Sequence, residues 1–315
     1  MKILNIGSLN LDYVYQVDHM VCGGETISSD GMEVYLGGKG FNQSVALANA
    51  GVEVYHAGIV GTEGEVFFDA CLRYGIRSSY IKRGSMRNGH TIIQIDKAGQ
   101  NAIMLYGGCN RAFSKEYIND VLDGFEPGDY LILQNEVNLL DYIIDRAYEK
   151  GLIIVLNPSP YDAYLDACKL EKISFFVLNE IEGFQMSGKT KEDEILSKME
   201  EMFPQAGVLL TLGKRGAIYA KEGKRWKQEI YNSPVVDTTA AGDTFTGYFV
   251  ASLIKMVPVE EALKISTMAS AIAVSRKGAA PSIPTSEEVM SELGKQILNA
   301  KGGTKYETIT NQAGH

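Results

Sequence analysis

The sequence predicts an α/β fold built on a mostly parallel central sheet. Short apolar segments alternate with helical segments from residue 130 to residue 212, a rhythm typical of βαβ units. Polar residues follow each of these apolar segments, as they do where parallel strands end at a ligand crevice. Hydrophobic residues make up 45% of the 315-residue chain and charged residues 22%, so the chain can bury a sizeable core.

Polar loops follow the first two predicted strands. Residues 3–6 form a short apolar segment, and Asn10 and Asp12 come soon after it, where they could hold hydroxyl groups or form an Asx-turn. A strand at 33–36 leads into the run Gly37-Gly38-Lys39-Gly40-Phe41-Asn42 and then a helix. The glycines of this run would let the backbone approach a ligand, and its asparagine could bind a polyol. A glycine-rich helix start without a ligand is the alternative.

A predicted hairpin interrupts the βα rhythm. A strand at 52–60 and a helix at 63–74 are followed by two apolar segments, Thr91 to Asp96 and Ala102 to Tyr106. Such an excursion from an α/β body would form a lid, with one apolar face over a ligand and the other against a partner subunit. An edge hairpin packed on its own core is the alternative.

The following segments repeat strand and helix in regular order. We expect strands at 130–133, 151–156, 175–178 and 208–212, helices at 137–150, 180–187 and 190–203, and a hairpin at 216–220 and 224–230. Carboxylates and amides at strand ends can hold sugar hydroxyls or a hydrated magnesium ion, although any one of them could be a helix cap. These groups are Gln134-Asn135-Glu136, Asn157-Pro158, Asn179 to Glu182 and Thr211-Leu212-Gly213.

The stretch from Asp237 to Phe245 places small residues between two carboxylates. The apolar, small-residue run that follows is typical of a buried helix, so Ala241 to Asp243 would form a first turn whose free N–H groups attract anions. The small residues leave room for a phosphoryl group, and Asp243 could accept a proton beside it. This arrangement favours phosphoryl transfer, with an aspartate cap on an ordinary core helix as the alternative.

The C-terminal segments are predicted to be helical around one loop. A helix at 260–275 is followed by Arg276 to Ser282, whose two cations fit either a phosphate or a solvated helix C-terminus. A final amphipathic helix is expected at 286–298, and a polar tail at 301–315.

Charge and composition exclude several classes of function. The net charge of −9 argues against broad binding of nucleic acid or anionic membrane. The four cysteines lack metal-ligand spacing, and no apolar run approaches membrane length, so we expect a cytoplasmic protein. The glycine run is neither a dinucleotide fingerprint nor a Walker loop, which weakens the hypothesis of a nicotinamide-dependent reductase.

Seven motifs in order, between about residue 2 and about residue 298, resemble those of the ribokinase-like carbohydrate kinase family. They are Gly7-Ser8-Leu9-Asn10-Leu11-Asp12, Gly37-Gly38-Lys39-Gly40-Phe41-Asn42, Asn157-Pro158, Asn179-Glu180, Thr211-Leu212-Gly213, Asp237 to Phe245, and Arg276-Lys277-Gly278-Ala279-Ala280-Pro281-Ser282. The resemblance implies one three-layer αβα sandwich at 1–300, with a mostly parallel central sheet and a small β-sheet lid from about 11–37 and 89–107.

The resemblance also implies an activity and its site. ATP would phosphorylate a small sugar, with D-ribose expected to give D-ribose 5-phosphate, with Mg²⁺ as a cofactor and K⁺ as an activating cation. Asp243 would be the base, beside an anion hole of Ala240, Ala241, Gly242 and Asp243. The sugar would contact Asn10, Asp12, Gly38, Lys39, Asn42, Glu136 and Asp243. The nucleotide would lie along Asn179, Glu182, Thr211, Gly213, Gly242 and Thr267. K⁺ would lie among Asp237, Thr239, the carbonyls of Ala273, Arg276 and Gly278, and Ser282.

Some features leave the substrate open. His90 to Gln94 lies in the expected lid where the family more often has smaller residues, and Phe41 follows the glycine loop, so another pentose, a hexose or a nucleoside remains an alternative. A non-catalytic sugar or nucleotide sensor is a second alternative, although a sensor has no need of the base. The resemblance implies a homodimer that forms through the lid.

Overall fold

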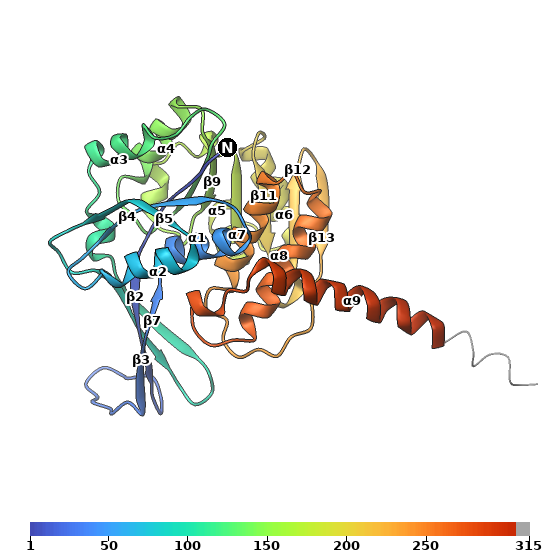
Figure 1. Ribbon diagram of the computed structural model, residues 1–315, viewed down its shortest axis with the longest axis horizontal. Coiled ribbons are helices and arrows are strands. Elements are labelled where there is room, and N and C mark those ends of the chain that lie inside the picture. The colour runs from blue at the N-terminus through green and yellow to red at the C-terminus, as the bar shows by residue number, and fades with distance from the viewer. Residues whose placement is uncertain (307–315) are drawn as a thin grey trace, which may run out of the picture.

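The computed structural model describes residues 1–306 and contains a large, mostly parallel sheet (Figure 1). The sheet order is β13-β12-β11-β10-β9-β8-β1-β4-β5, and only the last two strands in sequence, β12 and β13, pair antiparallel to their neighbours. Its strands are β1 (Ile3–Ile6), β4 (Val54–Val60), β5 (Arg77–Arg83), β8 (Tyr130–Gln134), β9 (Ile153–Asn157), β10 (Phe175–Asn179), β11 (Gly207–Thr211), β12 (Ala217–Lys221) and β13 (Lys224–Gln228).

A second sheet projects from the body, as Figure 1 shows. Its order is β3-β2-β6-β7, formed by β2 (Asn10–Gln16), β3 (Gly31–Gly37), β6 (Gly89–Ile95) and β7 (Asn101–Tyr106). The chain leaves β1 and enters β2 after only three residues, so Asn10 and Asp12 lie at the junction of the two sheets. The predicted hairpin is therefore part of a four-stranded sheet.

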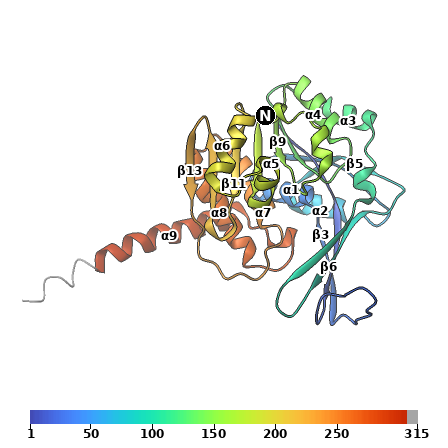
Figure 2. The same cartoon turned by 180° about the vertical axis from the view of Figure 1, so that it is seen from behind.

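Helices cover both faces of the large sheet, and Figures 1 and 2 view these two faces in turn. One face packs against α1 (Lys39–Asn49), α2 (Val66–Tyr74), α7 (Ala241–Ile254), α8 (Val259–Val274) and the start of α9 (Ser286–Tyr306). The other packs against α3 (Lys115–Leu122), α4 (Leu140–Glu149), α5 (Glu180–Ser187) and α6 (Glu192–Met202). Short 3₁₀ turns are η1 (Gly108–Arg111), η2 (Ala163–Ala167), η3 (Leu170–Lys172), η4 (Gly213–Arg215) and η5 (Ala280–Ser282).

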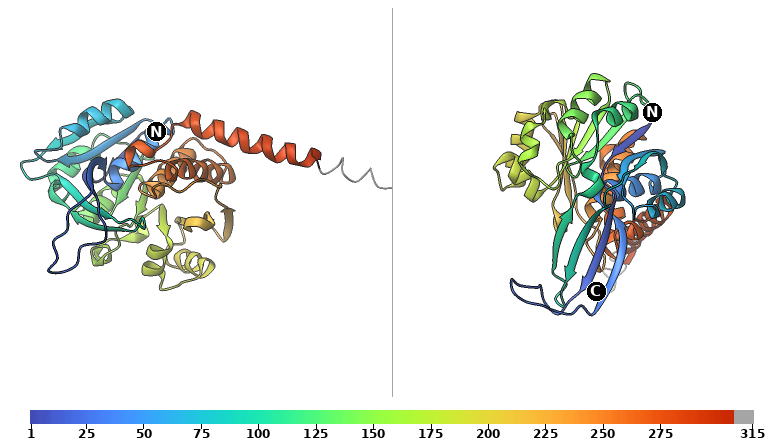
Figure 3. Two further views of the ribbon diagram at one scale, coloured as in Figure 1. Left: turned by 90° about the horizontal axis from the view of Figure 1, so that it is seen from below. Right: turned by 90° about the vertical axis from the view of Figure 1, so that its left-hand side faces the viewer.

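The alternation of side chains along each strand produces these two cores. Ile3 faces the cluster that includes α1 and α7, whereas Leu4 and Ile6 face the cluster that includes α3 and α4. The right-hand view of Figure 3 shows the resulting helix, sheet and helix layers edge-on. This is the three-layer arrangement that the sequence predicts.

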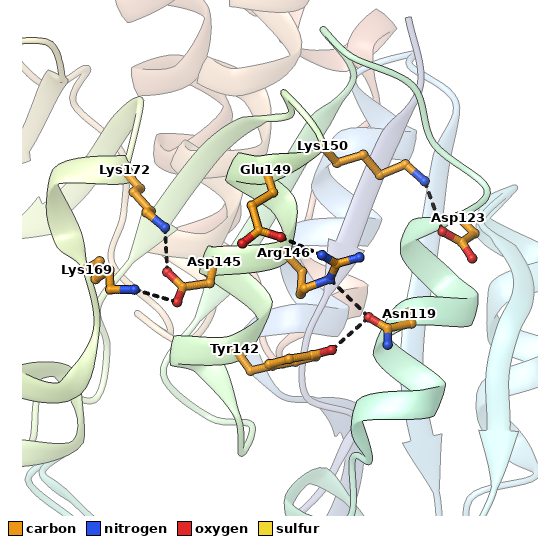
Figure 4. Close-up of polar contacts among 9 residues, drawn as sticks. All are labelled: Asn119, Asp123, Tyr142, Asp145, Arg146, Glu149, Lys150, Lys169 and Lys172. Atoms are coloured by element: carbon orange, nitrogen blue, oxygen red, sulfur yellow. Dashed lines mark hydrogen bonds and ion pairs between the residues drawn. The ribbon is translucent and has the colours of Figure 1, made fainter.

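Polar contacts on the outer surface join α3, α4 and the loop after β9 (Figure 4). Tyr142 donates to Asn119 Oδ1 at 3.0 Å, and Asp145 accepts from Lys169 at 2.9 Å and from Lys172 at 2.7 Å. These groups are partly or fully exposed, and exposed ion pairs contribute little to the free energy of unfolding. Apolar packing therefore holds this layer.

The structure corrects the predicted C-terminus. The last helix was expected to end near residue 298 before a polar tail at 301–315, but α9 continues to Tyr306. The helix continues through Gly302 and Gly303, because each glycine costs only about 1 kcal/mol in a helix and an established helix adds one hydrogen bond per residue. Residues 307–315 of the expected tail lie outside the described residues. None of the helices up to Tyr306 has the length and apolar character of a membrane span.

Close contact between α1 and β1 fixes the position of the glycine loop. A Cβ atom on Gly40 would lie 2.5 Å from the nitrogen of Ser8 and 2.6 Å from the Cα of Gly7, so a larger residue would push the helix away. Asn5 reinforces the contact, since its Nδ2 donates to the carbonyl of Gly40 at 2.8 Å. The start of α1 is thereby held at the carboxyl end of β1.

The fully buried His56 of β4 makes stability depend on pH. Its Nδ1 lies 2.8 Å from Ser44 Oγ on α1, and burial lowers its pKa to about 4. The unfolded chain binds a proton at His56 below about pH 6.5 while the folded protein does not, so stability is lost as the pH falls from about 6.5 to about 4.

We expect the binding of this proton to appear as a pH dependence of the free energy of unfolding, measured by urea denaturation. Between pH 7.5 and pH 5, His56 lowers the free energy of unfolding by about 2 kcal/mol. In His56→Asn, the free energy of unfolding should therefore fall by about 2 kcal/mol less over the same interval than in wild type. The asparagine Oδ1 can still accept the hydrogen bond from Ser44. Parallel pH profiles for the two proteins would contradict the assignment.

Candidate active site

The junction of the two sheets gathers the predicted sugar-binding residues around Asp243. Asn42, in the first turn of α1, donates from Nδ2 to Asp243 Oδ2 at 3.0 Å. Asp12 on β2 and Glu136, in the turn after β8, are close enough to Asp243 for the charges to interact. Segments more than 200 residues apart thus meet at the carboxyl ends of the central strands, as expected for an open α/β sheet.

Asp243 lies in the first turn of α7. Ala240 precedes this helix with φ 60°, a left-handed conformation that turns the chain sharply into it. Ala241 donates to the carbonyl of Thr238 at 3.3 Å, whereas the amides of Gly242 and Asp243 belong to the helix turn that lacks intrahelical acceptors. Of the predicted anion hole, these two amides are the best placed to bind an anion.

Gly242 faces open space. A Cβ atom there would meet no other atom within 4 Å, and the backbone of Gly242 is not in the left-handed region. Neither crowding within the chain nor backbone conformation therefore requires a glycine. The open space above the helix N-terminus is suited to a bound phosphoryl group.

The predicted sugar-binding groups are held by a second set of polar side chains. Asp12 Oδ1 accepts from Thr91 Oγ1 at 2.5 Å, across the β2–β6 pair. Glu136 accepts from the backbone amide of Lys39 at 3.0 Å and from the hydroxyl of Ser8. The groups are therefore oriented before any ligand arrives.

Asn10 and Asn42 complete this side of the site. Asn10 Oδ1 accepts from Asn110 Nδ2 at 2.7 Å, and Asn110 Oδ1 accepts from the amide of Leu9 at 3.0 Å. Asn42 Oδ1 is buried and meets no donor within the described residues. A buried acceptor without a partner is costly, so a ligand hydroxyl that donates to Asn42 would satisfy it.

Burial and the charges of neighbouring groups shift the pKa values of the charged groups in the site. Burial raises the pKa of Asp12 to about 7, and the charges of Glu136 and Asp243 add to this effect while the hydrogen bond from Thr91 opposes it. Burial also raises the pKa of Glu136. For Lys39, burial acts to lower the pKa, but the negative charges of Asp243, Glu136 and Glu182 outweigh it and the pKa is raised. Lys39 therefore stays cationic among the carboxylates.

The predicted nucleotide side lies at the ends of β10 and β11. Asn179 and Glu182 form a reciprocal capping box at the start of α5, with Asn179 Oδ1 accepting from the Glu182 amide at 2.9 Å. Thr211 donates to the carbonyl of Leu178 at 3.2 Å, and Gly213 begins the next turn with φ 52°. Thr267 is buried inside α8, where its hydroxyl bonds to Leu263 at 2.7 Å.

Asp237 joins the two segments of the predicted cation site through hydrogen bonds. Its Oδ1 accepts from the Thr239 amide at 2.8 Å and its Oδ2 from the Gly278 amide at 3.0 Å. The carbonyl of Ala273 and the buried Ser282 lie on the adjoining segments, and Arg276 pairs with Glu288 instead of facing a phosphate. Residues 237–239 and 273–282 thus form one unit next to the anion hole.

Sequence reasoning missed Gln43, which supports the site. Gln43 donates to Asp243 Oδ1 at 3.0 Å, and Gln134 and Asn157 contact Gln43. Gln43 directly follows the glycine run, which was the available signal, but a polar residue in a helix is usually exposed. Only the direction of its side chain reveals its contact with Asp243.

Known proteins are similar to this chain over most of its length. The ribokinase of Haemophilus influenzae is 32% identical over 297 residues, which cover 91% of this chain and 97% of that protein. The ribokinase of Cryptococcus neoformans var. grubii in complex with ADP has TM-score 0.82 and 31% identity, covering 92% of this chain and 99% of that one. The Arabidopsis thaliana ribokinase complexed with ribose and ATP has TM-score 0.80 and 26% identity, covering 92% and 97%.

These structures confirm the predicted fold class. The sequence pattern of the pfkB family carbohydrate kinases matches residues 1–286. This match spans the sheet junction, the glycine loop and the start of α7, and it confirms the family inferred from the seven motifs. The chain belongs to the pfkB family of carbohydrate kinases.

Proposed function

We propose that this chain is an ATP-dependent ribokinase that converts D-ribose and ATP to D-ribose 5-phosphate and ADP. The observation that carries the proposal is the position of Asp243. Its carboxylate lies at the N-terminus of α7, beside the open space at Gly242 and next to the unpartnered Asn42 Oδ1. A hydroxyl held there would have a proton acceptor on one side and an anion-binding helix end on the other.

The chain's own residues account for the steps of transfer. Asp12, Asn42, Lys39 and Glu136 would hold the sugar, and Asp243 would take the proton of the attacking hydroxyl. The Gly242 and Asp243 amides would stabilise charge on the transferred phosphoryl group. Phosphoryl transfer needs alignment and charge neutralisation more than covalent help, which suits a site of preset amides and carboxylates.

ATP, Mg²⁺ and K⁺ complete the proposed site. Asn179, Glu182, Thr211 and Gly213 would lie along the nucleotide phosphates, and Mg²⁺ when bound would neutralise their charge. At the proposed K⁺ site, Asp237, Thr239, Ser282 and the carbonyls of Ala273, Arg276 and Gly278 offer oxygen donors alone, which fits a hard cation. Because both Asp237 oxygens accept backbone amides, a cation there would stiffen the loop that carries the anion hole.

The small sheet supports the proposed lid and dimer. The side chains of β7 are exposed along its length, and apolar groups gather on this sheet, which favours a homodimer formed through it. Its exposed apolar residues are Met32, Val34, Ile103, Met104 and Leu105. We further propose that residues 1–300 act as one domain in the cytoplasm.

Release of ADP tests the function and the cation together. We expect sugar-dependent ADP release to be fastest with D-ribose among pentoses, deoxypentoses, hexoses and nucleosides, and faster in K⁺ than in Na⁺ buffer. A different preferred acceptor would reassign the substrate. Equal rates in the two buffers would remove the K⁺ site, and an absence of ADP release with every acceptor would favour a sensor.

Removing the proposed base should lower turnover while substrate binding survives. Asp243→Asn keeps the size of the side chain but cannot accept the proton, so kcat should fall roughly 10²–10⁴-fold. Asp193→Asn, in the exposed first turn of α6, is the matched control and should leave kcat unchanged. A kcat for Asp243→Asn within about threefold of wild type would exclude Asp243 as the base.

Sugar binding should be linked to the proton on Asp12. Because burial raises the pKa of Asp12 to about 7, the free site holds a neutral Asp12 at lower pH, whereas sugar hydroxyls favour the carboxylate. The Kd for ribose, measured by calorimetry, should fall about 10-fold from pH 6 to pH 8 in wild type. In Asp12→Asn it should be higher and should lack this change. If the Kd for ribose changed equally with pH in both proteins, the proton would belong to a group other than Asp12.

A further inference from the structure

Behind Asp243 lies a row of buried polar side chains to which the proposed reaction assigns no role. Gln43, on α1, is fully buried and donates from Nε2 to Asp243 Oδ1 at 3.0 Å. Asn42 donates to the other carboxylate oxygen, Oδ2, also at 3.0 Å. One acceptor position on each oxygen is therefore taken by an amide from the same helix turn.

The orientation of the Gln43 amide is fixed by its neighbours. Its Oε1 accepts from Gln134 Nε2 at 2.7 Å, and that nitrogen also donates to Asn5 Oδ1 at 3.1 Å. The Nδ2 of Asn5 donates to Ser44 Oγ at 2.9 Å, and Ser44 Oγ lies 2.8 Å from Nδ1 of His56. Burial keeps His56 neutral at neutral pH, so Nδ1 can accept from Ser44. The row therefore divides at Gln134, whose Nε2 donates to Gln43 on the side of Asp243 and to Asn5 on the side of His56.

Gln43 also connects the proposed base to the nucleotide side. Its Nε2 lies 3.3 Å from Asn157 Oδ1, and Asn157 Nδ2 is 3.5 Å from Glu182 Oε2. A glutamine that only filled the core would have no reason to direct its donor at a carboxylate in the site. The donor contacts of Gln43 Nε2 instead reach the carboxylate of Asp243 and Asn157 at the carboxyl end of β9.

We propose that Gln43 is a positioning residue that fixes the direction of the Asp243 carboxylate. This inference rests on the proposed phosphoryl transfer. With Gln43 and Asn42 each bound to one oxygen, the carboxylate cannot rotate, and its remaining lone pairs keep one direction relative to the sugar hydroxyl. A misplacement of about 1 Å at such a group can cost roughly 10²-fold in rate.

Charged groups on several elements lie around Asp243. Lys39 on α1 favours the carboxylate, whereas Asp12 on β2 and Glu136 after β8 oppose it. Glu182 on α5 adds negative charge beyond Asn157. The Gln43 amide donates to Asp243 Oδ1 and so supports the carboxylate form that accepts the proton.

The test compares two substitutions at Gln43 in the full chain. Gln43→Met keeps length and burial but removes the amide, so kcat for ribose should fall roughly 10- to 100-fold while KM for ribose and ATP stays within about threefold. Gln43→Glu places a second carboxylate beside Asp243, so the acid limb of the kcat–pH profile should move up by about 1 pH unit or more. If Gln43→Met fails to fold, the pH profile of Gln43→Glu alone decides.

Controls separate this inference from the proposed function. Gln205→Met and Gln205→Glu change an exposed glutamine in the turn before β11 and should leave kcat and the pH profile unchanged. If wild type releases ADP with ribose and the Gln43 variants keep its kcat and acid limb, the positioning role is overturned and the kinase proposal stands. A lower melting temperature with an unchanged acid limb would make Gln43 purely structural. If wild type releases no ADP with any sugar, the proposed function itself fails.

Discussion

The close approach of α1 to the end of β1 is the constraint on which the site depends. Gly40 lies against Gly7 and Ser8 at distances that admit no Cβ atom, and Asn5 locks the contact through the Gly40 carbonyl. From this fixed point the first turn of α1 directs Asn42 and Gln43 at Asp243, more than 200 residues away in the chain. Moving the helix outward by even one methyl group would separate these amides from the carboxylate, so the packing of two backbones determines the chemistry of the site.

The second determinant is a balance of buried charges. Asp12, Glu136 and Asp243 share a small volume with Lys39, and burial favours the neutral form of each isolated group. Lys39 remains charged because the charges of Asp243, Glu136 and Glu182 outweigh its burial, whereas burial raises the pKa of Asp12 to about 7. A polyol that donates hydrogen bonds to these carboxylates replaces the lost water. This physical need links the unusual electrostatics of the free protein to the binding of a sugar.

Much of the fold was predictable because strands and helices repeat with their own periods. The apolar segments at 130–133 and 208–212 became β8 and β11, and the small-residue run after Asp243 became α7. The end of the last helix was not predictable, since Gly302 and Gly303 resemble a stop yet remain helical. Asp243, Asp12 and Asn42 were proposed as site residues from local motifs, but Gln43 and Asn110 were not, because the sequence does not tell whether a polar side chain points inward.

The sequence by itself determined the family, the order of the layers and the candidate site residues, because periodicity and short motifs are local properties of the chain. Only the tertiary structure decided which groups meet. It paired Thr91 with Asp12, gave Asp243 two amide donors, left Asn42 Oδ1 without a donor among residues 1–306, and assigned Arg276 to Glu288 instead of to a phosphate. Contacts between residues far apart in the chain depend on how helices and strands pack. The pKa of Asp12 follows from that packing, because burial and neighbouring charges do not exist until the chain has folded.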